Sequence, residues 1–426
     1  MKLSWFQIVR LGLVQMCLGA IVVLTTSTLN RLMVVELALP AVLPGLLVAL
    51  HYSIQLSRPS WGPKSDAGGK RTRWIIGGMA ILGTGGFLAA VGVPLLAANY
   101  WVGLIVSILA YALIGVGVGA SGTSLLALLA TATAPHRRAA AATITWLMMI
   151  FGIAVTATVI GKMLTPYSPQ LLLQLVGAVC LIATALTAIA VWGIERSVQA
   201  ERAPSPTPFR EALSEVWAED RARRFTIFVF LSMTAYFMQE LILEPYAGLV
   251  FGLTPGESTS LSGAQNGGVF MGMLLVGIAA TGLKLGSLRN WVIAGCLGSA
   301  LSLATLSFIG STPINALLQP TVIALGFFNG MFAVAAIGSM MSLAGEGRER
   351  REGTRMGLWG AAQAIAAGFG GLTGAALVDL ARTQTADATA FGAVFLLEAA
   401  IFVCAALLAL KVMDRTPVGA GLVPGE

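Results

Sequence analysis

Residues 58–73 read RPSWGPKSDAGGKRTR, a polar segment with five Lys or Arg residues between two long apolar stretches. The whole chain is 57% hydrophobic and only 11% charged, with a mean hydropathy of +0.84. A soluble domain carries about 25% charged residues. Most of this chain therefore cannot face water, and the basic segment is expected to be a loop between two membrane-spanning helices.

Twelve stretches of the sequence are apolar and long enough to span a bilayer, at about 20 residues each. They cover 11–30, 38–57, 74–96, 101–133, 140–163, 170–194, 225–247, 263–283, 290–310, 316–343, 356–379 and 389–411. An even number of spans places both termini on one side. Of the 26 Lys and Arg residues, all but Arg31, Lys162 and Arg382 fall in segments on that side. Because cytoplasmic loops retain Lys and Arg, the sequence predicts cytoplasmic termini.

A polar, proline-rich segment divides the chain near its middle. Residues 195–224 carry six Lys or Arg residues, and apolar residues recur at helical spacing after Pro208. We expect a cytoplasmic linker with an amphipathic helix on the membrane face, or alternatively an ordinary loop helix packed on the bundle. The linker would join a six-helix half at 1–194 to another at 225–415, with a cytoplasmic tail at 416–426. The 50 glycines favour close helix packing.

The opening segment also carries a motif. Its Gly62, Asp66, Gly69, Lys70 and Arg71 resemble the loop signature of the major facilitator superfamily, G-x-x-x-D-x-x-G-R/K-R/K. The two glycines permit tight turns, and the aspartate can pair with a basic residue or cap a helix. The resemblance implies an all-α membrane protein with 12 transmembrane helices in two six-helix pseudo-symmetric halves. In that architecture a binding cavity lies between the halves near the midplane.

Two polar strings interrupt the apolar spans at corresponding places in the two halves. The first, 25–37, contains Arg31 and Glu36, and the second, 239–246, contains Glu240 and Glu244. Charged groups in a span are costly unless they are paired. One hypothesis makes the carboxylates contacts to a cargo, or proton carriers. The other, which we favour, pairs Arg31 with Glu36 or Glu244 as an ion pair that locks the outer gate.

These strings are similar to those of a known family. Residues 29–37, 244–246 with 251–253, 119–123 and 357–363 resemble the PucC/LhaA family, the bacteriochlorophyll-delivery branch of the major facilitator superfamily in purple phototrophs. The chain most resembles the compact member encoded among bacteriochlorophyll synthesis genes and once labelled a synthase subunit. The resemblance implies handling of bacteriochlorophyll or a late precursor, assembly of light-harvesting complexes, and location in the bacterial inner (intracytoplasmic) membrane.

A magnesium-containing pigment needs an axial ligand and a flat apolar surface. His51 is the histidine placed inside a predicted span, and its imidazole is a candidate ligand to the pigment magnesium. Phe328 and Trp359 are candidates to face the pigment ring. Weaker candidate ligands are the amides of Gln363, Gln15, Asn266 and Asn329. The alternative for His51 is an interhelical hydrogen bond, and for the two aromatic residues it is core packing.

Motifs for catalysis and for other ligands are absent from the sequence. The five aspartates never form the D-x-x-x-D pattern with which prenyl-transferring synthases hold magnesium and diphosphate, and no phosphate-binding glycine loop occurs. Four isolated cysteines show no metal spacing. The net charge of +7 follows from the basic loops and does not indicate nucleic acid. The sequence therefore predicts a chain that is not an enzyme and binds no nucleotide, free metal or nucleic acid.

We therefore expect a protein that binds bacteriochlorophyll or a late precursor in the lipid bilayer and delivers it during assembly of light-harvesting or reaction-centre complexes. The expected partners are bacteriochlorophyll synthase, geranylgeranyl reductase and the light-harvesting or reaction-centre polypeptides. One alternative is a proton-coupled exporter of a small amphipathic molecule. Another is a pigment-free scaffold for the synthesis enzymes. Sparse polar residues in the spans argue against a sugar or amino-acid substrate.

Overall fold

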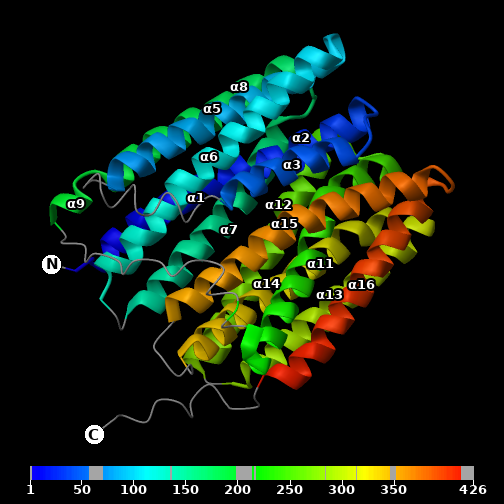
Figure 1. The fold of residues 1–426 in the computed structure, drawn as a ribbon. Helices are drawn as coiled ribbons and strands as arrows, with labels where there is room; N and C mark the ends of the chain where they lie inside the picture. The colour runs from blue at the N-terminus through cyan, green and yellow to red at the C-terminus, as the bar shows by residue number, and fades with distance from the viewer. Residues whose placement is uncertain are drawn as a thin grey trace, which may run out of the picture. The chain divides into compact units, whose positions relative to one another are not determined.

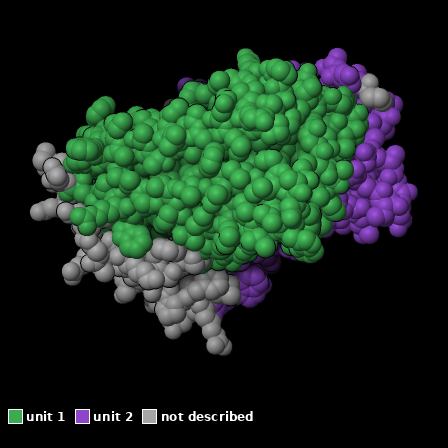
Figure 2. All heavy atoms as spheres, turned by 90° about the horizontal axis from the view of Figure 1, so that it is seen from above, with its two compact units in different colours: residues 1–205, 240–263 green, residues 206–239, 264–426 purple. Residues whose placement is uncertain are grey.

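The computed structural model describes residues 2–56, 71–134, 137–197, 214, 217–283, 285–312, 314–345 and 352–413, and every regular element in these ranges is a helix. The motif residues Gly62, Asp66, Gly69 and Lys70 lie outside them, as does most of the predicted linker helix. The chain forms two compact units, shown in green and purple in Figure 2.

Unit 1 comprises Met1–Ser205 and Glu240–Gly263. Its helices, in blue to green in Figure 1, begin with a segmented first span. The segments are α1 (Trp5–Val23), the π-helix η1 (Leu24–Thr28), α2 (Leu29–Arg31) and the π-helix η2 (Leu32–Glu36). They are followed by α3 (Val42–Gln55), α5 (Arg71–Ala98), α6 (Tyr100–Ala132), α7 (Arg138–Met163), α8 (Pro169–Val191) and α9 (Ile194–Ser197).

Unit 2 comprises Pro206–Gln239 and Ala264–Glu426. Two helices belong partly to each unit: α11 (Asp220–Phe251) ends in unit 1, and α12 (Pro255–Val276) begins there. The remaining elements of unit 2 are η4 (Gly277–Gly282), α13 (Leu288–Ser311), α14 (Asn315–Gly345), α15 (Glu352–Arg382) and α16 (Asp387–Val412). The predicted halves, 1–194 and 225–415, stay a prediction.

The described helices confirm the prediction of an all-α polytopic membrane protein. Eleven are long and apolar enough to cross a membrane, and the twelfth predicted span corresponds to the shorter apolar helix α3. On α8, Leu181 is 74% exposed, Ile182 65% and Ile189 66%. Apolar side chains this open are expected where a helix faces lipid.

Several span boundaries differ from the prediction; the eighth span, for example, begins at Pro255 rather than at residue 263, after the turn at Gly252. Two further differences, at the end of the first span and the start of the second, have a clear local reason. The first span continues to Glu36 rather than ending at residue 30, because its polar residues are buried inside the protein. The second span begins at Val42 rather than at residue 38. Ala38 has a φ of 49°, a left-handed conformation that ends the first span, and Pro40 follows it before the next helix.

Glycines set the distance between α5 and α6, which pack along much of their length. A β-carbon on Gly78 of α5 would lie 2.5 Å from the backbone nitrogen of Ser121, and one on Gly117 of α6 would lie 2.5 Å from that of Leu82. Both distances are impossible for real β-carbons. The two helices therefore pack backbone against backbone, as small residues allow in a membrane.

The neighbouring glycine supplies a matched test of this contact. A β-carbon on Gly77 would meet nothing within 4 Å. We expect Gly78→Ala to destabilise the protein by about 1–3 kcal/mol through overpacking. Gly77→Ala should be neutral or slightly stabilising, since alanine is the better helix former. Thermal unfolding of both variants in detergent measures the difference. Equal transition temperatures would contradict a close contact at Gly78.

Candidate functional site

The C-terminal third of the first span is buried on every side. All residues from Leu24 to Val34 are buried, although a lipid-facing helix would expose one face. Two π-helical segments, η1 and η2, flank the short α2 within this stretch. The Thr25 carbonyl accepts a hydrogen bond from the Tyr111 hydroxyl of α6 (2.7 Å). π-Helical turns are rare and often mark functional sites.

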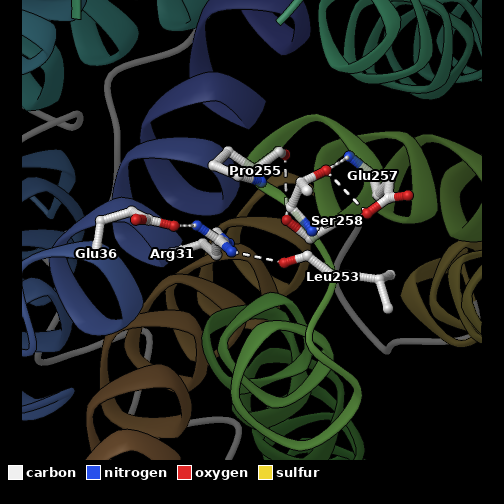
Figure 3. A network of polar contacts seen from close by, with 7 residues as sticks. Arg31, Glu36, Leu253, Pro255, Glu257 and Ser258 are labelled. Atoms are coloured by element: carbon white, nitrogen blue, oxygen red, sulfur yellow. Dashed lines mark hydrogen bonds and ion pairs between the residues drawn. The ribbon is translucent and has the colours of Figure 1, made fainter. Parts of the chain in front are cut away.

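Arg31 is the charged residue at the centre of this stretch, and its side chain is only 2% exposed. Its Nη1 donates to Glu36 Oε1 (2.5 Å) and its Nη2 donates to the backbone carbonyl of Leu253 (2.7 Å), as Figure 3 shows. Glu36 is 40% exposed, so the ion pair joins a buried cation to a partly solvated anion. Within the described residues, Arg31 Nε has no hydrogen-bond acceptor.

The Leu253 carbonyl lies in the turn between α11 and α12, and the residues around it favour such a turn. Gly252 ends α11 in a left-handed conformation (φ 69°), and the Leu253 N–H bonds to the Ala247 carbonyl (3.2 Å). Helix α12 then begins with Thr254 as N-cap, and the Glu257 carboxylate accepts hydrogen bonds from the backbone N–H (2.8 Å) and hydroxyl (2.9 Å) of Thr254. Figure 3 shows this turn beside Arg31. The end of α11 and the start of α12 together fix the position of the Leu253 carbonyl that Arg31 binds.

Glu244 of α11 is 2% exposed and accepts a hydrogen bond from the Ser27 hydroxyl. The Ser27 and Ser262 hydroxyl oxygens are 2.9 Å apart. Because a hydroxyl has one proton, Ser262 donates to Ser27 when Ser27 donates to Glu244. The second carboxyl oxygen of Glu244 has no hydrogen-bond partner among the described residues. The hydroxyls of Ser258 and Ser262 also lie close to this carboxyl, so Glu244 is surrounded by serines.

Further contacts tie the first span to Glu240–Gly263. Thr26 donates to Glu240 at 3.4 Å, and Thr259 donates to Thr28 at 3.2 Å. Asn30 donates from Nδ2 to the Leu241 carbonyl (2.6 Å). The two polar strings of the sequence, more than 200 residues apart, thus meet side by side in unit 1. We call Thr26, Ser27, Arg31, Glu36, Glu240, Glu244 and Ser262 the polar cluster.

Helix α7 and the segment after it border the same region. A β-carbon on Gly161 would lie 2.5 Å from the backbone nitrogen of Ser260, so α7 and the start of α12 are in backbone contact. Tyr167 follows α7, outside the spans. Burial raises the pKa of the Tyr167 phenol, Glu36 raises it further and Arg31 opposes this, which places Tyr167 within electrostatic reach of the ion pair.

Of the other predicted site residues, His51 lies in unit 1, and Phe328, Trp359 and Gln363 lie in unit 2. His51 on α3 is 1% exposed, and its ring lies 4.3 Å from that of Tyr52. In unit 2, Trp359 is fully buried against Phe225 and donates from Nε1 to Thr226 (3.1 Å). Phe328 and Gln363 are half-buried in the same unit. Their proposed roles toward a pigment stay predictions.

Arg71 is the one residue of the loop motif in the described part of the chain. It is 6% exposed, and its Nη1 donates to Thr131 (2.5 Å) and to the Ala127 carbonyl (3.1 Å) of α6. Glu195 accepts from the backbone N–H groups of Arg71 (2.8 Å) and Thr72 (3.0 Å), and so caps the start of α5. Arg71 therefore anchors the end of this loop to unit 1.

Comparison with known proteins places the chain in a family. The model of the family described as PUCC protein matches residues 28–416. The chain belongs to the PucC family. This PucC protein is 65% identical to the "Bacteriochlorophyll synthase 44.5 kDa chain" of Rhodobacter capsulatus, over 100% of this chain and 99% of the relative. It is 30% identical to Protein PucC of the same species, over 96% of this chain and 92% of the relative.

The name of the 65%-identical relative corrects one prediction. The sequence predicted a protein that is not an enzyme, whereas this relative is named as a chain of a synthase. The expectation rested on missing motifs within one chain. That reasoning fails for a chain that belongs to an enzyme, because the residues that bind diphosphate can lie on another chain of it.

Two solved transporters share the fold at low sequence identity. The nucleoside transporter NupG superposes with a TM-score of 0.72 at 13% identity, covering 97% of this chain and 100% of its own. A bacterial homologue of the human lysosomal transporter Spinster gives a TM-score of 0.68 at 15% identity, covering 97% and 99%. Both confirm the major facilitator fold.

Sequence reasoning missed several members of the site. Neither the Leu253 carbonyl nor the hydroxyls of Ser27 and Ser262 were expected as partners. The Gly-Leu-Thr-Pro run at 252–255 was the available signal, because it predicts a helix stop followed directly by a helix start. Within the described residues, no group of three or more His, Cys, Asp or Glu side chains could hold a metal ion. The polar cluster is thus built from hydroxyls, carboxyls and one guanidinium.

The Ser27–Glu244 hydrogen bond can be tested directly. We expect Ser27→Ala to destabilise the protein by about 0.5–1.5 kcal/mol, because it removes one of the serine hydroxyls that bond the buried Glu244 carboxyl. Ser53→Ala is the matched control, since exposed Ser53 bonds only to the Ala49 carbonyl of its own helix. Thermal unfolding in detergent reads out both. Adding Glu244→Leu should remove most of the Ser27→Ala effect; simple additivity would argue against this pairing.

Proposed function

We propose that this PucC protein binds bacteriochlorophyll or a late precursor within the membrane and passes it on, as a membrane chain that works with bacteriochlorophyll synthase. The recipients are polypeptides of light-harvesting or reaction-centre complexes. The membrane is the inner or intracytoplasmic membrane of a phototrophic bacterium, with both termini cytoplasmic. The observation that carries the proposal is the 65% identity, over the whole chain, to the Rhodobacter capsulatus synthase chain.

The distribution of polar residues supports an apolar cargo. In unit 1, much of the hydrogen-bonding capacity inside the spans is taken up within the polar cluster. Sites for sugars or amino acids need several convergent polar groups that remain available to the ligand. A chlorin ring with a long prenyl tail instead requires mainly apolar surface and one or two polar contacts. The composition, 57% hydrophobic, fits that requirement.

The polar cluster supplies a latch for such a carrier. Arg31 holds Glu36 and the turn at Leu253, and Ser27 holds Glu244, so the first span and Glu240–Gly263 are fastened together in unit 1. Releasing the turn would leave a buried guanidinium without one of its acceptors. Loss of a hydrogen bond to a charged group costs about 1.5–3 kcal/mol. A rearrangement at this end of the first span therefore needs a replacement partner, which a polar group of the cargo or water can provide.

A proton-coupled exporter is the second candidate, and one observation favours it. Glu240 and Glu244 lie one helical turn apart on α11, each accepting a hydrogen bond from a hydroxyl of the first span. Buried carboxyls in membrane spans commonly carry protons in transporters. This candidate requires a carboxyl at 240 or 244 for transport, whereas pigment binding does not. A pigment-free scaffold would require neither a carboxyl at these positions nor a bound pigment.

The absorption spectrum of the gently purified protein tests the proposal. We expect near-stoichiometric bacteriochlorophyll after expression in a purple phototroph, well above the amount bound by an unrelated facilitator prepared identically. We expect His51→Ala to lose most of this absorption, because the imidazole is the candidate axial ligand. Ser53→Ala, on the same helix, should keep it.

The outcomes separate the candidates. Pigment retained by His51→Ala would keep pigment binding and assign the ligand elsewhere. Absence of pigment above the control would overturn pigment binding. The exporter would then predict transport driven by a pH gradient and abolished by Glu240→Gln or Glu244→Gln. The scaffold would predict co-purification of synthase activity without pigment.

A further inference from the structure

Unit 2 contains an acidic residue that neither the family comparison nor the polar cluster accounts for. Glu398 lies in the middle of α16, which reaches a mean hydropathy of 2.6, the highest among the eleven spans. The residue is fully buried, and neither carboxyl oxygen has a hydrogen-bond partner among the described residues. An ionised carboxylate in such a place is very costly, whereas a neutral acid is far less so.

The register of the helices shows what lies at the level of Glu398. The rings of Phe332 on α14 and Phe402 on α16 are 5.7 Å apart, and further along both helices Ser339 Oγ is 3.7 Å from Met413 Sδ. Helices α14 and α16 therefore run in the same direction. One helical turn before Phe402 is Glu398, and about one turn before Phe332 is Asn329.

Asn329 is also fully buried and has unused capacity. Its Oδ1 accepts from the Ser299 hydroxyl of α13 (2.8 Å), while its Nδ2 has no hydrogen-bond partner among the described residues. Helix α13 packs against both α14 and α16. Three helices of unit 2 thus bring one serine, one amide and one carboxyl to the same level. Among the described residues, the Asn329 amide has an unused donor and the Glu398 carboxyl has unused acceptors.

Charges that could balance an ionised Glu398 are distant along every helix packed on α16. On α16 itself, Asp387 and Lys411 are 11 and 13 positions away, roughly 16 and 20 Å at 1.5 Å per residue. Helix α14 carries no ionisable residue. The ionisable residues of α13 and α15 are Arg289, Cys296, Glu352, Arg355, Asp379 and Arg382. Those of α15 all lie within four positions of its ends, and Cys296 of α13, like Cys404 of α16, is an uncharged thiol when protonated.

We propose that Glu398 is an exchangeable proton-binding site in the core of unit 2, with Asn329 as the amide that receives its ionised form. In the arrangement described here the carboxyl carries its proton, so no donor is required. When the proton leaves to water, the site gains one negative charge. The charge then needs a donor, and Asn329 Nδ2, held in place through Ser299, is the unused donor that the register brings nearest.

Such a site links proton occupancy to the packing of α13, α14 and α16. Protonation favours the present packing, and deprotonation favours any arrangement that moves the Asn329 amide or water to the carboxyl. A ligand shifts a conformational equilibrium only through its different affinity for the two states. Glu398 provides that difference for a proton, whatever cargo the chain carries.

Infrared difference spectroscopy of the full-length protein in lipid tests the site. The carbonyl stretch of a protonated carboxyl side chain is distinct from that of a carboxylate and shifts in D2O. We expect a pH titration of the wild type to show one such band from an acid without hydrogen bonds. Glu398→Gln should lose this band completely. Asp387→Asn, on the same helix, should keep it.

Two further variants guard against misfolding and test the amide. Glu398→Asp retains a titrating carboxyl, so it should show a shifted band where Glu398→Gln cannot be purified. Asn329→Leu removes the donor for the ionised form, so the midpoint of the wild-type band should shift to higher pH. A band unchanged in Glu398→Gln, or no protonated carboxyl in the wild type that is sensitive to this position, would overturn the site. An unchanged midpoint in Asn329→Leu would remove Asn329 from it.

Discussion

A buried guanidinium is the constraint around which this end of unit 1 is organised. The Arg31 guanidinium carries a positive charge and five N–H donors, so a buried position requires acceptors inside the protein. Glu36 supplies one of them five residues later, and the Leu253 carbonyl supplies another. That carbonyl is available because Gly252 takes a left-handed conformation, and Gly248 leaves room for the guanidinium: a β-carbon there would lie 3.2 Å from Nη2. The buried Arg31 therefore depends on Glu36 and on two glycines, Gly248 within α11 and Gly252 at its end.

The all-helical fold could be predicted because the bilayer leaves few choices. A backbone in hydrocarbon must satisfy its own hydrogen bonds, so long apolar stretches become helices. The ends of helices depend on other forces. The span that begins at Trp5 extends to Glu36 because protein, rather than lipid, surrounds its polar residues, a fact that hydropathy cannot report. Ala38 had no sequence signal for its left-handed backbone, since glycine or asparagine is the usual choice there.

The candidate site could be predicted only in part, for a related reason. The cost of an isolated charge in a span pointed to Arg31 and Glu36, which are near each other in sequence. The partners of Glu244 and Asn30 are 217 and 211 residues away, and two of the acceptors are backbone carbonyls that any residue could supply. Glu398 was overlooked because it has no partner to form a pattern with. The prediction that the chain is not an enzyme failed differently, because the absence of a motif from one chain says nothing about the other chains of a multi-chain enzyme such as the one for which the relative is named.

The two buried carboxyls illustrate how hydrogen bonding separates a structural role from a titrating one. Glu244 accepts a hydrogen bond from the Ser27 hydroxyl and lies near Ser258, Ser262 and Arg31, so its carboxyl is held by its surroundings. Glu398 has no hydrogen-bond partner in the part of unit 2 that the structure describes. Replacing a carboxyl by an amide should therefore have different effects at the two positions. At position 244 it changes a group that several neighbouring side chains contact, whereas at position 398 it fixes the uncharged state and removes only the ability to leave it.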